Sequence, residues 1–189
     1  ISEKQAKYIR NVIAARLWRY GLQLNREKTK IVYCAQEDRP ARPGTDVEFT
    51  FLGYTFRPRY ARLADGRWKT GFLPAVSKQA CKAMAKVIRG WKLGRRTDLT
   101  FEEVATKINR IVAGWINYYG RFYKSLLIAF LDRRINPHLV KWACRKYKRL
   151  HRMPAKARRR LAHIASTNPG LLVHWRHGAL PAGSTTGAV

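Results

Sequence analysis

The feature that most constrains this chain is the uneven distribution of its charge. It carries 39 Lys and Arg against 11 Asp and Glu, a formal net charge of +28 over 189 residues. From Arg133 to the end there is no Asp or Glu at all. A folded domain with this charge repels itself unless it meets a polyanion, and each phosphate that Lys or Arg neutralises releases a counterion. Nucleic acid is therefore the expected partner.

The remaining composition is that of a folded protein. Hydrophobic residues make up 46% of the chain and aromatic residues 12%. No apolar run is long enough to span a bilayer, so we expect no membrane partner. Cys34, Cys81 and Cys144 lie far apart without a C-x-x-C pair, which suits a reducing compartment and predicts neither a disulfide framework nor a metal site. The chain starts at Ile1 inside a helical pattern, so we expect it to be a fragment with upstream sequence missing.

Local patterns predict mixed α/β structure up to residue 73. Residues 3–20 predict an amphipathic helix that ends at Gly21. Extended segments are predicted at residues 22–24, 30–34, 49–60 and 67–73. Asp65-Gly66 lies between the last two segments and is a strong hairpin signal.

Beyond Pro74 the pattern predicts helices alone. Ser77 is a candidate N-cap, and Thr100 with Glu103 forms a capping-box pattern. Further helices are predicted at about 124–150, bent or restarted at Pro137, and at 155–165. The fold class is therefore α+β. Its predicted parts are residues 1–73, a helical domain over 74–178 and a disordered tail over 179–189.

The third of these helices carries a predicted phosphate-binding stripe. Its cations follow helical spacing on one face, while Leu139, Ala143, Tyr147 and Leu150 form a packing face. Cations about one helical turn apart match the spacing of successive phosphates. The predicted contacts are Lys141, Arg145, Lys148, Arg149 and Arg152. The alternative is a basic face that is merely solvated.

Two further residues are candidates for contacts with a base or a ribose. Tyr118 and Arg121 fall off the packing face of the helix that contains Trp115. Aromatic rings and Arg planes stack on unpaired bases. We therefore predict that these two side chains contact nucleic acid.

Several strings resemble the C-terminal part of group II intron reverse transcriptase/maturases, in the right order over about residues 1 to 178. The maturase-like strings are GWINYYG at 114–120, LVKWACRKYKRL at 139–150 and His174-Trp175 after Pro169-Gly170. The strings that resemble the end of a reverse transcriptase palm are GLQLNREKTK at 21–30 and FLGYTF at 51–56.

The resemblance implies a role for each part. Residues 1–73 would be the end of the palm, and 74–178 the thumb and maturase-specific domain. The residues similar to a primer grip are Phe51, Leu52, Gly53 and Tyr54. Lys28 or Lys30 would lie in a motif whose lysine assists nucleotide addition, although either also suits an ordinary turn. The implied partners are structured intron RNA, an RNA/DNA template-primer and the upstream polymerase half, in a bacterial cytoplasmic nucleoprotein.

One departure from the family is decisive for activity. Two-metal polymerisation needs carboxylates that converge on Mg²⁺, and this sequence contains no Asp-Asp pair. We therefore expect no cofactor in the fragment, Mg²⁺ only in the intact polymerase, and no polymerase activity from this chain alone. The predicted function is support of intron splicing and RNA-directed DNA synthesis through RNA binding. A nonspecific RNA chaperone, a ribosome-associated protein and the thumb of a non-intron reverse transcriptase are the alternatives.

Overall fold

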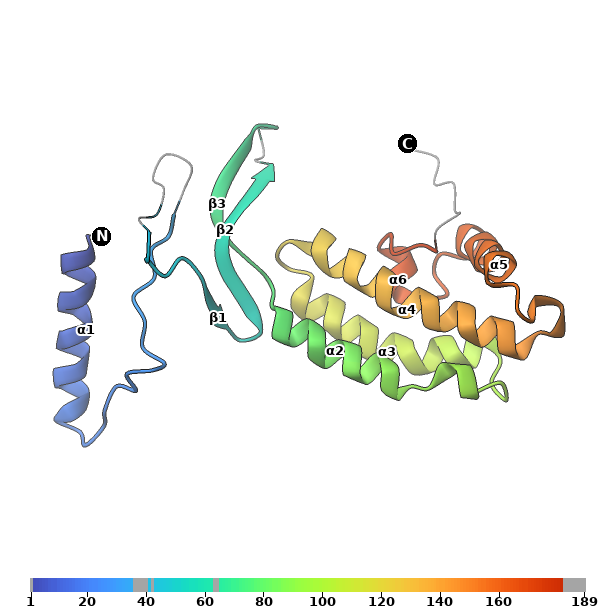
Figure 1. Ribbon diagram of the computed structural model, residues 1–189, viewed down its shortest axis with the longest axis horizontal. Helices are drawn as coiled ribbons and strands as arrows, with labels where there is room; N and C mark the ends of the chain where they lie inside the picture. The colour runs from blue at the N-terminus through green and yellow to red at the C-terminus, as the bar shows by residue number, and fades with distance from the viewer. Residues whose placement is uncertain (1, 36–40, 42, 63–64, 182–189) are drawn as a thin grey trace. The chain divides into compact units, whose positions relative to one another are not determined.

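The computed structural model describes residues 2–35, 41, 43–62 and 65–181, and it is α+β (Figure 1). Three antiparallel strands form one small sheet in the order β1-β2-β3. In chain order the elements are α1 (Glu3–Trp18), β1 (Phe49–Phe51), β2 (Tyr54–Arg62), β3 (Trp68–Val76), α2 (Lys78–Gly90), α3 (Phe101–Tyr119), α4 (Lys124–Lys146), α5 (Pro154–Thr167) and α6 (Val173–Arg176). Short 3₁₀ helices η1 (Leu93–Arg95) and η2 (Lys148–Leu150) follow α2 and α4.

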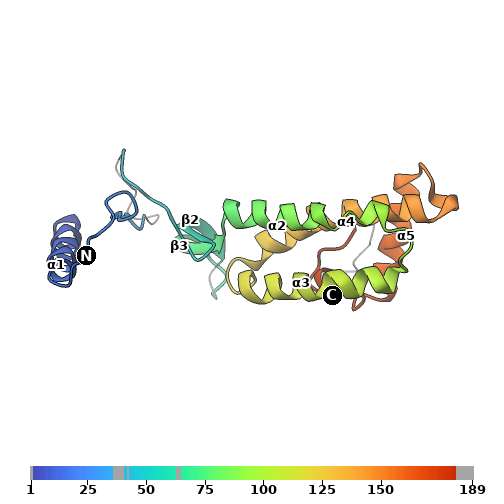
Figure 2. The ribbon, with the colours of Figure 1, turned by 90° about the horizontal axis from the view of Figure 1, so that it is seen from below.

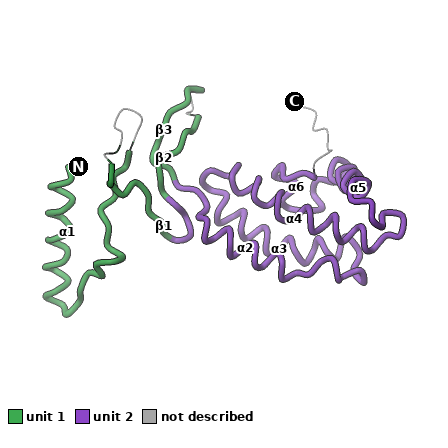
Figure 3. The backbone as a smooth tube through the Cα atoms, viewed as in Figure 1, with its two compact units in different colours: residues 1–51, 56–73 green, residues 52–55, 74–189 purple. Residues whose placement is uncertain are grey.

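The chain divides into two compact units (Figure 3). The first contains residues 1–51 and 56–73, and the second contains 52–55 and 74–189. The second unit, called the helical unit below, holds almost all of the buried core. The assignment of residues 1–73 to a palm stays a prediction.

In the first unit, α1 forms as the sequence predicts, but it buries nothing. Ser2 caps it through a capping box with Gln5, and Gly21 follows it with a positive φ of 73°. Its apolar side chains stay exposed, with Ile9 at 46% and Val12 at 48%. Among the described residues of this unit, Ala35 alone is buried.

Two predicted extended segments of this unit are not strands. Residues 22–24 and 30–34 have no strand structure, although the turn between them forms, with the Lys28 N–H donating to the Asn25 side chain. A strand needs a neighbouring strand for its backbone groups. Here the Leu22 N–H donates back to the Leu17 carbonyl of α1, and the Tyr33 N–H makes a single bond to the Asp46 carbonyl. The sequence pattern alone did not reveal that a partner strand is lacking.

The predicted strand 49–60 is two strands joined by a tight turn. Leu52 and Gly53 both have positive φ, 48° and 77°, which is the type I′ geometry that joins twisted antiparallel strands. The hairpin predicted at Asp65-Gly66 connects β2 and β3, and Arg67 N–H donates to the Asp65 side chain there. Leucine is an unusual residue at positive φ, which explains why the first turn was not predicted.

The helical unit is built around α4. Figures 1 and 2 show α2, α3 and α4 side by side along their length, with α5 and α6 packed on α4. Ser77 and Thr100 cap α2 and α3 as predicted, Thr100 through a capping box with Glu103. The α4 side chains with no exposed surface are Leu127, Leu131, Ile135, Leu139 and Trp142.

Helix α4 does not restart at Pro137, and it ends before the predicted residue 150. It runs through Pro137 without interruption and ends at Lys146. An internal proline costs about 3 kcal/mol or more. Complete burial of Ile135 and Leu139 on either side offsets that cost, since burying each side chain stabilises by about 1.5–3 kcal/mol.

A buried polar cluster joins α4 to α6. Asn136 Oδ1 accepts the Trp175 indole N–H at 3.0 Å and lies 3.2 Å from His174 Nε2. Because Oδ1 can only accept, Nε2 carries a proton, and burial lowers the pKa of His174 to about 3, so the imidazole is neutral at pH 7. Asn136 Nδ2 donates to Asp132 and to the Ala179 carbonyl. One amide therefore holds the chain end against the core.

This contact also corrects the predicted start of the tail. A disordered tail from residue 179 was expected, yet Ala179 is 1% exposed and its N–H donates to the His174 carbonyl. The small residue fits because it supplies a backbone carbonyl to Asn136 rather than a side chain. The rest of the predicted tail, residues 182–189, lies outside the described residues.

Replacing Asn136 with Leu is expected to lower the free energy of unfolding by about 2–4 kcal/mol, because Trp175 and His174 would keep buried donors without an acceptor. Asn117 is an exposed asparagine on α3 and provides the matched control. Asn117→Leu should change the free energy by less than about 0.5 kcal/mol. Urea unfolding followed by circular dichroism measures both, and equal effects would contradict the cluster's role.

Burial of His174 should make the helical unit sensitive to acid. Desolvation lowers the pKa of His174 from 6.5 to about 3, so the unfolded chain takes up a proton below pH 6.5 that the folded chain does not. The free energy of unfolding should therefore fall by about 1.4 kcal/mol for each pH unit below 6.5, and show no dependence from His174 above it.

The comparison that isolates this effect is His174→Gln, whose amide can still donate to Asn136. His138 and His177, whose pKa values are also lowered, chiefly by burial, are present in both proteins. Urea unfolding measures the free energy of unfolding at pH 7 and at pH 5.5. The fall between these two pH values should be smaller in the variant, because its unfolded chain takes up about one proton fewer. Identical pH profiles would show that His174 is not held neutral by the fold.

Candidate nucleic-acid interface

The predicted cationic stripe is exposed but is not on one helix. Lys141 and Arg145 belong to the last turns of α4, Lys148 and Arg149 lie in η2, and Arg152 stands just before α5. All five side chains are exposed. The chain leaves helical geometry at Tyr147, which has an extended φ of −103° and ψ of 114°. The stripe is therefore a bent path of cations around the end of α4, and the straight helical spacing was wrong.

The structure gathers two stripe residues with one that the sequence did not single out. Lys141 and Arg152 lie with Arg158 of α5 around a surface hollow of about 380 Å³. The apolar residues that line the same hollow are Pro137, Val140, Cys144 and Pro154. Arg152 itself has a left-handed backbone with φ of 56°. We call these three cations the basic triad.

Other cations of this region are fixed by backbone carbonyls. Arg145 donates to the Gly94 carbonyl at 3.0 Å, and Lys146 donates to the Thr97 carbonyl at 2.9 Å. Lys146 also lies 5.9 Å from the ring centroid of Trp142. These bonds join α4 to the segment after α2, so the two residues have a structural role beside any role in binding.

Helix α5 provides cations that the sequence analysis missed. Its buried residues form one stripe, with Ala157 and Leu161 at 0% and 2% exposure. The exposed cations on the rest of the helix are Lys156, Arg158, Arg159 and Arg160. The signal was present, since the run Lys156–Arg160 lies in the acid-free part of the sequence beside small apolar residues at helical spacing.

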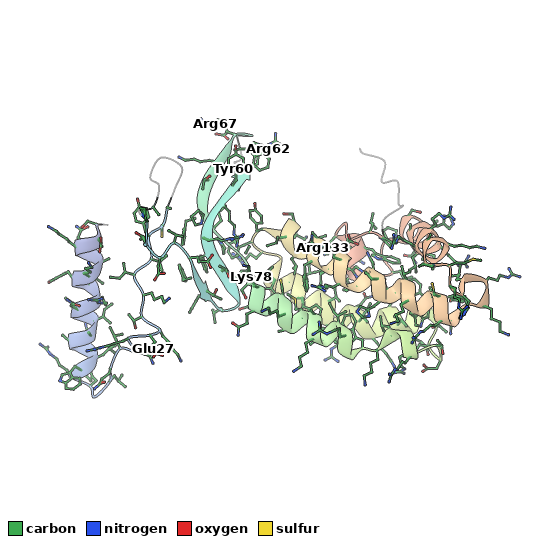
Figure 4. All side chains as sticks on the ribbon, viewed as in Figure 1. Glu27, Tyr60, Arg62, Arg67, Lys78 and Arg133 are labelled. Carbon is green, nitrogen blue, oxygen red and sulfur yellow. The ribbon has the colours of Figure 1, made fainter. Side chains whose placement is uncertain are left out.

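Internal pairing does not neutralise this surface. In the part of the chain that the structure describes, no ion pair involves a cation beyond Arg133, which Figure 4 labels on α4. The pKa of His138 is lowered by burial and then by Lys141 and Arg89, as expected near excess positive charge. The charge is therefore available to an external polyanion.

Tyr118 and Arg121 occupy an aromatic cluster at the end of α3. Tyr118 is 50% exposed, and its hydroxyl donates to the Leu52 carbonyl at 3.0 Å. Tyr54 donates in turn to the Tyr118 carbonyl, and burial, followed by the neighbouring tyrosines, raises its pKa. Arg121 is exposed, with its guanidinium carbon 5.9 Å from the Phe122 ring centroid. Both predicted side chains are therefore accessible to a ligand.

Of the primer-grip-like residues, Leu52 and Gly53 form the I′ turn and lie against this cluster within the helical unit. Phe51 and Leu52 are 61% and 66% exposed. A Cβ atom at Gly53 would lie 2.8 Å from the Tyr119 hydroxyl, so glycine is required here by a protein side chain as well as by its φ. The expected approach of a primer to Gly53 stays a prediction.

The two candidate auxiliary lysines lie in the first unit. Lys28 is exposed in the turn after α1, and Lys30 lies 3.9 Å from Asp46 in an exposed ion pair. Such a pair contributes about 0–1 kcal/mol. Within the described residues, no three His, Cys, Asp or Glu side chains are grouped to hold a metal, and no helix is long and apolar enough to cross a membrane.

Comparison with known proteins identifies the helical part of the chain. No curated protein and no solved structure matches it. A family model described as "Group II intron, maturase-specific domain" matches residues 81–162, from the first turn of α2 to the middle of α5. This stretch contains the basic triad and most of the buried core around α4. Residues 81–162 are thus similar to the maturase-specific domain of group II intron proteins, and this similarity points to a part in intron splicing.

Proposed function

We propose that the helical unit binds folded group II intron RNA through the cations at the end of α4 and on α5. In this proposal the chain supports intron splicing. Joined to an upstream polymerase half of the same protein, it also supports RNA-directed DNA synthesis. The observation that carries the proposal is the basic triad in a stretch that is similar to the maturase-specific domain.

The geometry of the triad suits a phosphate backbone. Lys141 lies in α4, Arg152 in the connection before α5 and Arg158 in α5, and the packing of α5 on α4 brings them around one hollow. An arginine contacts a phosphate through two N–H groups, while a lysine provides a point charge. The other residues that line the hollow are apolar, so none of its lining side chains is a carboxylate. A curved run of phosphates in a folded RNA fits this arrangement.

Template-primer binding belongs to the other end of the helical unit. Tyr118 and Arg121 present an aromatic ring and a guanidinium beside the turn Leu52-Gly53, which Tyr118 holds by its hydroxyl. We propose that this end contacts the template-primer when the polymerase half is present. Catalysis would require the Mg²⁺-binding carboxylates of that half, since this sequence contains no Asp-Asp pair.

The test is a salt titration of binding to folded group II intron RNA, with a perfect RNA duplex of matched length as competitor. The full chain should prefer the intron at moderate salt. The variant Lys141→Gln/Arg152→Gln/Arg158→Gln should bind the intron about 10- to 100-fold more weakly, with a salt slope lower by about 2–3, because each lost phosphate contact lowers the slope by about one.

The matched control removes the same charge from α1. Lys4, Arg10 and Arg16 are exposed there, and the triple Gln variant should keep most of the preference for folded intron RNA. Equal weakening by both triple variants, with no preference over duplex, would mean that total charge explains the binding. The chain would then be a nonspecific basic RNA binder.

A further inference from the structure

The hairpin formed by β2 and β3 carries an exposed pair of stacked aromatic rings. Tyr60 and Trp68 lie on neighbouring strands with ring centroids 5.3 Å apart and planes 14° from parallel. They are 57% and 56% exposed. A cross-strand aromatic pair stabilises a hairpin modestly, by about 0.2–1 kcal/mol. This modest stabilisation of the hairpin does not explain why two large rings are more than half exposed to water.

The same face of the sheet is aromatic along its length. Side chains two residues apart share a face of a strand, so Phe56 lies on the face of Tyr60, and Phe72 on that of Trp68. Phe49 of β1 stacks on Phe56 at 4.8 Å with planes 3° apart, and its ring lies 6.0 Å from that of Phe72. Aromatic surface therefore runs from the inner end of the hairpin to its tip.

Two cations, Arg62 and Arg67, flank the exposed pair at the tip of the hairpin, while Arg57, Arg59 and Lys69 fall on the opposite face by the same alternation. The sequence from Tyr54 to Leu73 contains five cations, Arg57, Arg59, Arg62, Arg67 and Lys69, against the single carboxylate of Asp65. Arg62 shares the face of Tyr60 by alternation, and its Nε donates to the Gly66 carbonyl at 3.1 Å. Arg67 is held by Asp65 at 2.7 Å while its side chain stays 82% exposed. Figure 4 shows Tyr60, Arg62 and Arg67 together at the tip of the hairpin.

We propose that this face binds an unpaired nucleic-acid strand, whose bases stack on Tyr60 and Trp68 and whose phosphates contact Arg62 and Arg67. Flat aromatic surface with cations beside it, here Arg62 and Arg67, is what a strand with free base faces recognises. A duplex hides those faces in its own stack, and a protein partner would need acidic residues against this cationic rim. The site is separate from the basic triad and takes a different form of nucleic acid.

The first measurement is photocrosslinking of the full chain to a short oligouridylate that contains 5-iodouridine, with mass spectrometry to locate the adduct. Adducts on Tyr60 or Trp68 are expected. The double variant Tyr60→Leu/Trp68→Leu should bind the same oligonucleotide about tenfold or more weakly, the loss expected for removing a stacked ring. Ribo- and deoxyribo-oligonucleotides compared in parallel distinguish an RNA strand from a DNA strand.

The control variant is Tyr8→Leu/Trp18→Leu on α1, where the residues are 70% and 67% exposed, and it should bind like the unaltered chain. Tyr60→Phe/Trp68→Tyr keeps aromatic rings on the same strands and should retain most of the affinity. If Tyr60→Phe/Trp68→Tyr loses as much affinity as Tyr60→Leu/Trp68→Leu, stacking on these rings is refuted. Crosslinked adducts found in the helical unit alone would refute it as well.

Failure of this proposal is distinguishable from failure of intron binding. The hairpin variants are measured with an unstructured strand, and the triad variant with folded intron RNA. Tyr60→Leu/Trp68→Leu should keep intron affinity at the level of the unaltered chain, which also shows that the helical unit remains folded. Unchanged oligonucleotide binding in that variant would refute the hairpin site and leave the basic triad unaffected.

Discussion

Burial of one face of α4 is the constraint on which the helical unit depends. Leu127, Leu131 and Leu139 are fully buried at intervals of four and eight residues, and the same side of the helix holds Asn136. Helices α2, α3, α5 and α6 all contact α4, so its buried face fixes their positions. Lys141 is left exposed beside this core, whereas Arg145 is bonded to the Gly94 carbonyl of η1, which packs against α4.

The absence of acidic residues after Asp132 has a second effect on this architecture. Two cations at the end of α4, Arg145 and Lys146, donate hydrogen bonds to backbone carbonyls and form no ion pair among the described residues. These bonds satisfy free carbonyl groups of the loop after α2 without cancelling charge. Arg and Lys therefore have two roles in this domain: they make its surface positive, and they bond α4 to the segment after α2.

Much of the helical fold was predictable because its signals are local. The N-caps Ser77 and Thr100, the hairpin at Asp65-Gly66 and the buried face of α4 all follow from short-range pattern. What the sequence hid depends on distant partners: the turn at Leu52, the unbroken helix at Pro137 and the burial of Ala179. The sequence was enough to predict that this region carries many exposed cations. It did not show that Arg158 lies beside Lys141 and Arg152, because that depends on the packing of α5 against α4.

The turn at Leu52-Gly53 belongs to the helical unit although its flanking strand residues belong to the other unit. The backbone consequently crosses the boundary between the units three times, at residues 51/52, 55/56 and 73/74. No single cut can separate them cleanly. A fragment that starts at Pro74 would leave the Tyr118 hydroxyl and the Ser77 N–H without the carbonyls of Leu52 and Gly53 that they bond. The smallest self-contained helical piece therefore reaches back to residue 52 and must carry the whole hairpin as its intervening loop.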